Sequence, residues 1–173
     1  MILTISSFAS FKKVTSFSPY KIKIFDFATS HMMSDTNIHT NVWRGNIRWQ
    51  PPEVCQQLFN ETHLIEHPTK IDIYSFGMFL WELVTARIPY FEHQDDITSI
   101  AKVIINGDIP EIPGDAPPQY TNIILSCVEM DPTKRPAFVQ LKPTFQELDI
   151  HGPQLELLLL KDQNKFLNVV EKV

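Results

Sequence analysis

The chain has 173 residues, of which 43% are hydrophobic, and its 15 basic and 20 acidic residues give a formal net charge of −5. This length suits a single domain with a sizeable core, and the negative charge argues against non-specific binding to nucleic acid. Two cysteines are too few for a disulfide scaffold and fit a reducing compartment. No run approaches the roughly 18 apolar residues of a membrane span, and no signal peptide is recognisable. These features predict a cytoplasmic protein.

Charged residues are unevenly distributed along the chain. Residues 1–25 carry four lysines and no acidic residue, whereas residues 89–131 carry eight acidic residues and one basic residue, Lys102. An acidic stretch of this kind is usually a solvated face, and the alternative left open is a docking surface for a basic partner.

The first part of the chain gives few signals of regular structure. Residues 1–20 lack periodicity, which predicts an irregular N-terminal segment. Residues 21–25 alternate polar and apolar side chains, which predicts a half-buried strand and favours a β-hairpin near 21–30. Residues 28–50 are polar and irregular, which predicts a long loop of the kind that often carries function.

Residues 71–86 (IDIYSFGMFLWELVTA) give the strongest helical signal of the sequence. Apolar side chains surround this helix instead of lining one stripe, so the helix must lie inside the protein. If the helices that would cover it are missing, part of its surface should form an exposed patch of roughly several hundred Å². We then expect the isolated chain to be marginally stable, to aggregate, or to pack against another molecule.

Three shorter helices are predicted after residue 90. Asp95 can cap the first, which ends near Gly107, and Pro117–Pro118 opens the second. The third follows Arg135–Pro136, and Pro143 inside it should produce a kink. The residues that should face inward are Ile97, Ile100, Ala101 and Ile104 in the first helix, Tyr120, Ile123, Ile124, Cys127 and Val128 in the second, and Phe138, Leu141, Phe145 and Leu148 in the third.

Two kinds of candidate site can be judged from the sequence, a glycine-rich phosphate-binding loop and a zinc site. The closest glycines are seven residues apart, so no glycine-rich phosphate-binding loop can be placed on the sequence. Residues 63–67 (HLIEH) fit the H-x-x-E-H motif of some zinc peptidases. Pro68 disfavours the helix that this motif needs, so a polar loop is the favoured interpretation.

Four motifs, in order along the chain, resemble those of the protein kinase catalytic domain. Residues 23–28 (KIFDFA) resemble K-I-x-D-F-G, and residues 45–53 (GNIRWQPPE) resemble G-T-x-R-W-M-A-P-E, which closes the activation segment. Residues 72–83 (DIYSFGMFLWEL) resemble the central C-lobe helix, and residues 131–136 (DPTKRP) resemble the D-P-x-x-R-P before the last helix of that lobe. The R-W and I-Y-S-F-G residues are similar to the tyrosine-kinase-like group. Within that group, the extended stretch before Asp26 resembles Roco-type leucine-rich-repeat kinases.

The resemblance implies a mainly α fold over residues 21–148, namely a kinase C-lobe with its activation segment, followed by a helical tail over 149–173. Asp26 matches the family's metal-holding aspartate and, with Phe27, would border bound ATP and magnesium in a full-length form. Ala28 stands where the family has glycine, which puts the usual flexibility of this segment in doubt.

The resemblance also implies roles for residues further along the chain. Glu53 and Arg135 match the ion pair that holds the activation segment to the lobe, and Asp72 matches an acceptor for backbone amides of the catalytic loop. The loop that would receive a substrate includes Asn46, Arg48 and Trp49, with Asn46 in place of the family's threonine. The positions where the family carries regulatory phosphorylation are matched by Ser30, Ser34, Thr36 and Thr40.

Several kinase motifs are missing from the sequence. It contains no glycine loop, no V-A-I-K lysine and no H-R-D-x-x-x-x-N catalytic loop, so the N-lobe and the catalytic base are absent. We therefore expect this chain alone to bind no ATP and to be inactive. Three hypotheses remain: a fragment of an ATP-dependent kinase acting on protein Ser, Thr or Tyr hydroxyls, a catalytically dead pseudokinase-like module that binds protein partners, or an unrelated helical scaffold.

Overall fold

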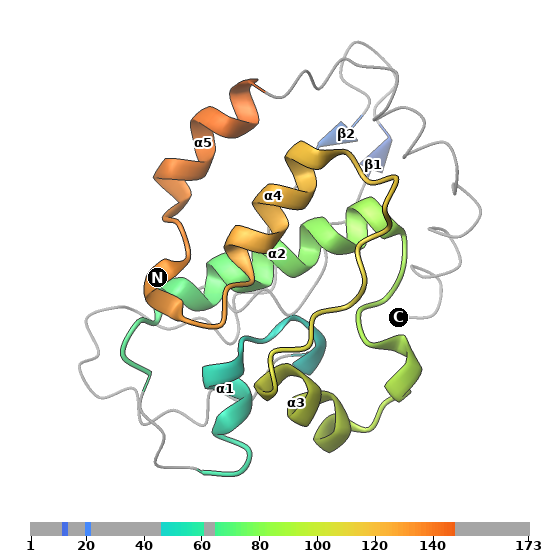
Figure 1. Ribbon diagram of the computed structural model, residues 1–173, viewed down its shortest axis with the longest axis vertical. Helices are drawn as coiled ribbons and strands as arrows, with labels where there is room; N and C mark the ends of the chain where they lie inside the picture. Colours follow the sequence, from blue (N-terminus) through green and yellow to red (C-terminus); the bar gives the residue numbers. More distant parts are fainter. Residues whose placement is uncertain (1–11, 14–19, 22–45, 61–64, 148–173) are drawn as a thin grey trace.

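The computed structural model describes residues 12–13, 20–21, 46–60 and 65–147, and the regular structure in this part of the chain is mainly helical (Figure 1). Two short strands, β1 (Lys12–Lys13) and β2 (Tyr20–Lys21), pair in antiparallel fashion. The helices that follow are η1 (Ile47–Trp49), α1 (Pro52–Gln56), α2 (Thr69–Thr85), η2 (Phe91–His93), α3 (Ile97–Ile105), α4 (Pro118–Cys127), η3 (Pro132–Lys134) and α5 (Phe138–Glu147).

The described strand pair overlaps the predicted strand only at Lys21. The period-2 pattern predicted a strand over 21–25 and a hairpin near 21–30, whereas the described pair joins residues 12–13 to residues 20–21. Two residues per strand are too short for an alternating pattern to be visible. The remainder of the predicted hairpin lies outside the described residues.

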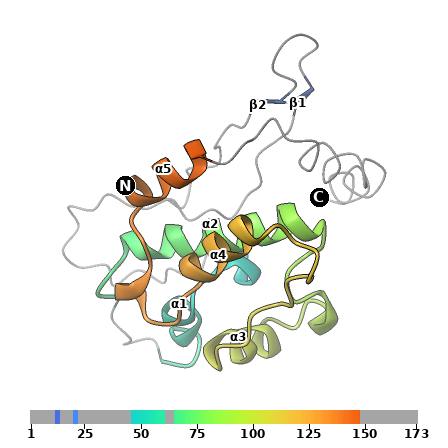
Figure 2. The same cartoon turned by 45° about the horizontal axis from the view of Figure 1, so that its top comes forward.

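Helix α2 runs through the middle of the described part, as its apolar circumference predicted (Figures 1 and 2). One hydrophobic cluster joins it to α1, α3 and η1, and a second joins it to α4 and α5. Every residue from 71 to 86 is buried or half-buried, and the large half-buried apolar side chains are those of Phe76, Phe79, Leu83 and Val84. The extended exposed apolar patch on this helix stays a prediction. Helix α5 covers part of α2, since the ring of Phe76 meets the rings of Phe138 and Phe145 edge to face.

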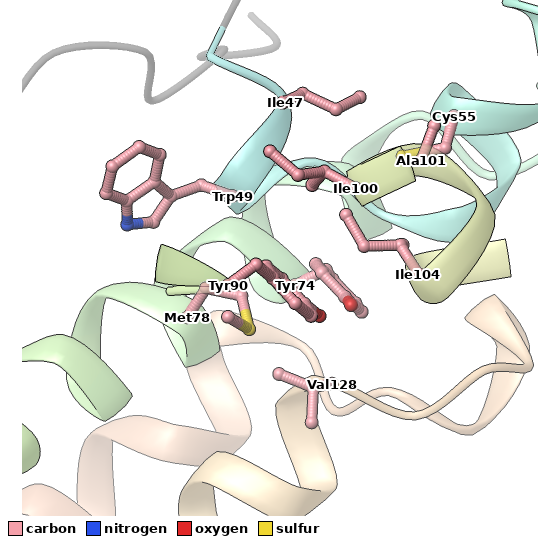
Figure 3. Packing of buried hydrophobic residues seen from close by; sticks show 10 residues of the cluster. All are labelled: Ile47, Trp49, Cys55, Tyr74, Met78, Tyr90, Ile100, Ala101, Ile104 and Val128. Atoms are coloured by element: carbon pink, nitrogen blue, oxygen red, sulfur yellow. The ribbon is translucent and has the colours of Figure 1, made fainter. Parts of the chain in front are cut away.

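Figure 3 shows the cluster on the α3 side of α2. Tyr74 and Met78 of α2 face Ile100 and Ile104 of α3, and all four side chains are almost fully buried. Val128, which follows α4, closes the lower edge of the group in this view. This cluster fixes α3 and the short η1–α1 segment against the central helix.

The close approach of α2 and α4 depends on Gly77. A Cβ atom at this position would lie 2.7 Å from Cβ of Cys127 and 2.9 Å from Cγ1 of Val128. Real Cβ atoms essentially never approach so closely, so any larger residue must push the two helices apart.

Gly77→Ala should therefore lower the free energy of unfolding by about 1–3 kcal/mol, the usual cost of overpacking. This holds although alanine favours a helix over glycine by about 1 kcal/mol. Urea unfolding followed by circular dichroism will measure the change. Gly114→Ala is the matched control, because no heavy atom lies within 4 Å of the place that its methyl group would take, and it should change stability by less than about 0.5 kcal/mol. Equal midpoints for the two variants would contradict this account of the helix packing.

The predicted boundaries of the later helices are close to those observed. Helix α3 begins at Ile97 and its cap is Asp96, not Asp95: the Asp96 carboxylate accepts hydrogen bonds from the amides of Thr98 and Ser99. Asp95 instead pairs with an arginine described below. After α3, Gly107 adopts a φ of +87°, which ends the helix as predicted.

In α3, Ile97 is 42% exposed, so its predicted inward position is wrong, whereas Ile100, Ala101 and Ile104 are buried as predicted. Helices α4 and α5 follow the predicted apolar positions, with one exception. Ile123, Ile124 and Cys127 are buried in α4, and Leu141 is buried in α5, which continues through Pro143. Phe138 is 47% exposed, so its predicted inward position holds only in part, and Leu148 lies outside the described residues. None of the described helices has the length and apolar character needed to cross a membrane.

Candidate functional site

The structure describes only part of the predicted site. Asp26 and Phe27, expected at the metal and nucleotide, lie outside the described residues, as do the four predicted phosphorylation positions Ser30, Ser34, Thr36 and Thr40. The predicted site residues that are described are Asn46, Arg48, Trp49, Glu53, Asp72 and Arg135.

Glu53 and Arg135, 82 positions apart in the sequence, form a two-pronged ion pair. Nη1 of Arg135 lies 2.6 Å from Oε1 of Glu53, and Nη2 lies 2.9 Å from Oε2. Glu53 is in the first turn of α1, and Arg135 directly follows η3. The parallel geometry is the strongest that a guanidinium and a carboxylate can adopt. This ion pair joins the start of α1 to the segment between η3 and α5.

The remaining N–H groups of the Arg135 guanidinium also donate hydrogen bonds. Its Nε donates to the carbonyl of Glu129 at 2.7 Å, Nη1 donates to that of Lys70 at 3.1 Å, and Nη2 donates to that of Met130 at 3.4 Å. With the two bonds to Glu53, all five N–H donors of an arginine have partners. The side chain is 1% exposed and its guanidinium lies 5.0 Å from the ring centre of Tyr74. A buried cation is tolerated here because every donor is satisfied.

The turn before Arg135 is held by its own cap. The Asp131 carboxylate accepts hydrogen bonds from both the amide and the hydroxyl of Thr133, at 2.9 and 2.6 Å. These bonds lower the pKa of Asp131. The ammonium of Lys70, on α2, donates a hydrogen bond to the backbone carbonyl of Arg135. The position of the guanidinium is therefore set from both sides.

A second link joins the same segment to α2 through Trp49. Its indole Nε1 donates to Oε2 of Glu82 at 3.1 Å, and its carbonyl accepts from the hydroxyl of Ser75 at 2.9 Å. Glu82 is 6% exposed, and burial raises the pKa of its carboxyl to about 8, against the opposing effect of the Trp49 hydrogen bond. Sequence reasoning missed Glu82, although a carboxylate within the apolar second half of α2 was a usable signal.

Arg48 forms a third link, to the turn between α2 and α3. Nη1 donates to the carbonyls of Pro89 and Tyr90, both at 2.7 Å, while Nη2 donates to the carbonyl of Gln94 and to Oδ1 of Asp95, the latter at 3.1 Å. Arg48 is only 6% exposed. Sequence reasoning could not find these partners, because three of them are backbone carbonyls.

These contacts involve the segment predicted to receive a substrate, and that role stays a prediction. The side chains of Arg48 and Trp49 are buried and bind within the lobe, so they hold the segment in place. Asn46 is exposed, and its side chain accepts a hydrogen bond from the amide of Arg48 at 3.3 Å. Asp72 is buried in the first turn of α2, and its predicted contact with a catalytic loop stays a prediction.

The described residues provide no candidate metal centre. Within them, no group of three or more His, Cys, Asp or Glu side chains is placed to hold a metal ion. The thiols of Cys55 and Cys127 are buried, and burial raises the pKa of each, so both act as small core residues and not as nucleophiles. What the arrangement does is fix residues 46–53 against α2, the α2–α3 turn and Arg135.

Comparison with known proteins agrees with this geometry. The family described as protein tyrosine and serine/threonine kinase matches residues 13–145. The probable serine/threonine-protein kinase pats1 of Dictyostelium discoideum is 38% identical over 122 residues, which is 69% of this chain and 4% of that protein. The dual specificity protein kinase pyk3 of the same organism is 36% identical over 121 residues, 69% of this chain and 8% of that protein.

A plant protein shows the same relation. The serine/threonine-protein kinase STY46 of Arabidopsis thaliana is 31% identical over 130 residues, 73% of this chain and 20% of that protein. The chain thus spans a fifth or less of the length of these relatives. The family match, together with the mainly α C-lobe architecture, shows that this chain belongs to the protein tyrosine and serine/threonine kinase family.

Proposed function

We propose that this chain supplies the C-lobe of an ATP-dependent protein kinase that transfers phosphate to protein hydroxyls. The observation that carries the proposal is the Glu53–Arg135 pair, with distances of 2.6 and 2.9 Å. Together with the Trp49 and Arg48 links, this pair holds the segment that would receive a substrate in one position. Phosphoryl transfer depends mainly on positioning and electrostatics, so a fixed substrate platform is what this reaction requires of a C-lobe.

ATP and magnesium are the cofactors that the proposal requires in a full-length form. Magnesium would neutralise charge on the transferred phosphate. Asp26 would hold the metal and Phe27 would pack beside it, as their motif implies. We propose that this chain alone binds neither, because it contains no glycine loop and no V-A-I-K lysine.

We assign the chain to a group within the protein kinase family from its sequence motifs. The R-W and I-Y-S-F-G residues favour the tyrosine-kinase-like group, and the extended stretch before Asp26 favours the Roco type within it. Relatives named as serine/threonine kinases and as dual specificity kinases both support a protein-hydroxyl substrate, and the choice between Ser/Thr and Tyr stays open. Regulation would act through Ser30, Ser34, Thr36 or Thr40. A cytoplasmic location belongs to the same proposal.

Loss of the metal-holding carboxylate provides the test. A longer product of the same gene that carries an in-frame H-R-D motif and glycine loop should transfer radiolabelled phosphate from ATP to a generic protein substrate. Asp26→Asn in that protein should reduce turnover by about a hundredfold or more, since the metal contributes several kcal/mol. Asp115→Asn, at an exposed aspartate, is the matched control and should leave turnover unchanged.

The alternative is a pseudokinase-like module that binds protein partners without catalysis. It is compatible with the lack of an H-R-D motif and a glycine loop within these 173 residues. It predicts a stable product of this length that binds another protein and shows no phosphotransfer. Stop codons in every frame upstream of Met1 would support it and would contradict the kinase proposal.

A further inference from the structure

We propose that residues 91–97 form a docking surface for a basic protein segment that carries an apolar side chain. This surface, called the 91–97 surface below, consists of η2 and the start of α3. It lies at the outer edge of the molecule next to α3 in both views (Figures 1 and 2). It is separate from the Glu53–Arg135 pair, and the proposal does not depend on catalytic activity.

An exposed aromatic residue is the centre of the 91–97 surface. The Phe91 side chain is 69% exposed, the most exposed aromatic ring among the described residues, and Ile97 is 42% exposed. Tyr90, the preceding residue, is only 2% exposed. Large aromatic side chains contribute most of the energy at protein interfaces when they become covered. Phe91 therefore offers an anchor that nothing in the described part of the chain covers.

The backbone that presents Phe91 is held in place on both sides. Arg48 bonds to the carbonyls of Pro89, Tyr90 and Gln94. Nδ1 of His93 lies 3.0 Å from the hydroxyl of Ser99 in α3. A surface that is already ordered loses little entropy when a partner binds, which favours a specific contact.

The charge around Phe91 selects the partner. Glu92, Asp95 and Asp96 lie within the same seven residues, and the side chains of Glu92 and Asp95 are 67% and 104% exposed. Arg48 pairs with Asp95 but is itself buried, so a partner meets mostly carboxylates. Lys102 is the only basic residue between 89 and 131. Lysine or arginine side chains beside an apolar residue would complement this surface.

The same charges disfavour a second copy of the chain as the occupant. A symmetric dimer would place the 91–97 surface of one copy against that of another. Three carboxylates from each side would then face each other, and like charges repel. The occupant we assign is therefore a separate basic protein segment.

Fluorescence anisotropy with a short labelled peptide of alternating lysine and leucine will test the assignment on the 173-residue chain. We expect binding that weakens as salt is raised, because exposed charges are screened. Phe91→Ala should weaken it about tenfold or more, as for an interface anchor, and Glu92→Gln about two- to fivefold. Phe59→Ala, at a phenylalanine that is 52% exposed elsewhere, is the matched control and should have no effect.

Three results would overturn the proposal. The first is equal weakening by Phe91→Ala and Phe59→Ala, with thermal melting confirming that both variants are folded. The second is equal binding of a peptide in which serine replaces leucine, since charge alone would then explain the contact. The third is a dimer, seen by sedimentation, that Phe91→Ala dissociates, because the occupant would then be a second copy.

Discussion

Replacement of Arg135 by methionine should lower the free energy of unfolding by about 3–5 kcal/mol, or abolish the cooperative transition altogether. The substitution leaves the carboxylate of Glu53 without its cation in a site where its side chain is only 12% exposed. Breaking one side of a buried ion pair has this large effect because the remaining charge stays buried. The carbonyls of Glu129, Lys70 and Met130 lose their donor at the same time.

The measurement is urea unfolding followed by circular dichroism, and two further variants make it specific. Lys134→Met changes the exposed neighbouring cation and should alter stability by less than about 0.5 kcal/mol. Arg135→Lys keeps the positive charge but not the forked set of N–H donors, so its loss of unfolding free energy should lie between those of Arg135→Met and Lys134→Met. If Arg135→Met costs no more than Lys134→Met, the pair does not hold the lobe together.

The resemblance to kinase motifs was sufficient to predict the Glu53–Arg135 pair, because both residues occur in recognisable runs and the family pairs these two positions. The apolar circumference of residues 71–86 was likewise sufficient to place α2 in the interior. Both inferences depend on side-chain identity, which a sequence states directly. The fold class followed from them.

Other features could not be read from the sequence, for two physical reasons. Arg48 binds the carbonyls of residues 89, 90 and 94, and since every residue has a carbonyl, side-chain identity does not reveal these partners. The cap of α3 was placed at Asp95 although Asp96 fills it, because adjacent aspartates are equivalent in a pattern and differ only in backbone geometry. How far α2 is covered depends on which helices pack against it, and contacts such as that of Phe76 with α5 are a property of the tertiary structure.

Glu82→Gln should stabilise the protein in alkaline but not in acidic solution. Burial raises the pKa of the Glu82 carboxyl to about 8 from its ordinary value of 4.5, so the folded state keeps a proton that the unfolded chain releases between these two values. In that range each step of one pH unit lowers the free energy of unfolding by about 1.4 kcal/mol. The contribution is fully present below about pH 4.5, falls as pH rises, and has lost about 4–5 kcal/mol above pH 8.

Glutamine is the right replacement because its side-chain oxygen can still accept the hydrogen bond from Nε1 of Trp49, now 3.1 Å from Oε2 of Glu82, and it carries no titrating proton. The quantity to measure is the difference in unfolding free energy between Glu82→Gln and the parent protein, from about pH 5 to about pH 8.5. Taking the difference cancels the titration of all other groups. Glu111→Gln, at an exposed glutamate, controls for the loss of a carboxylate as such. A difference that stays constant over this range would mean that Glu82 is charged in the folded state, and that its contact with Trp49 is a bond to a carboxylate anion.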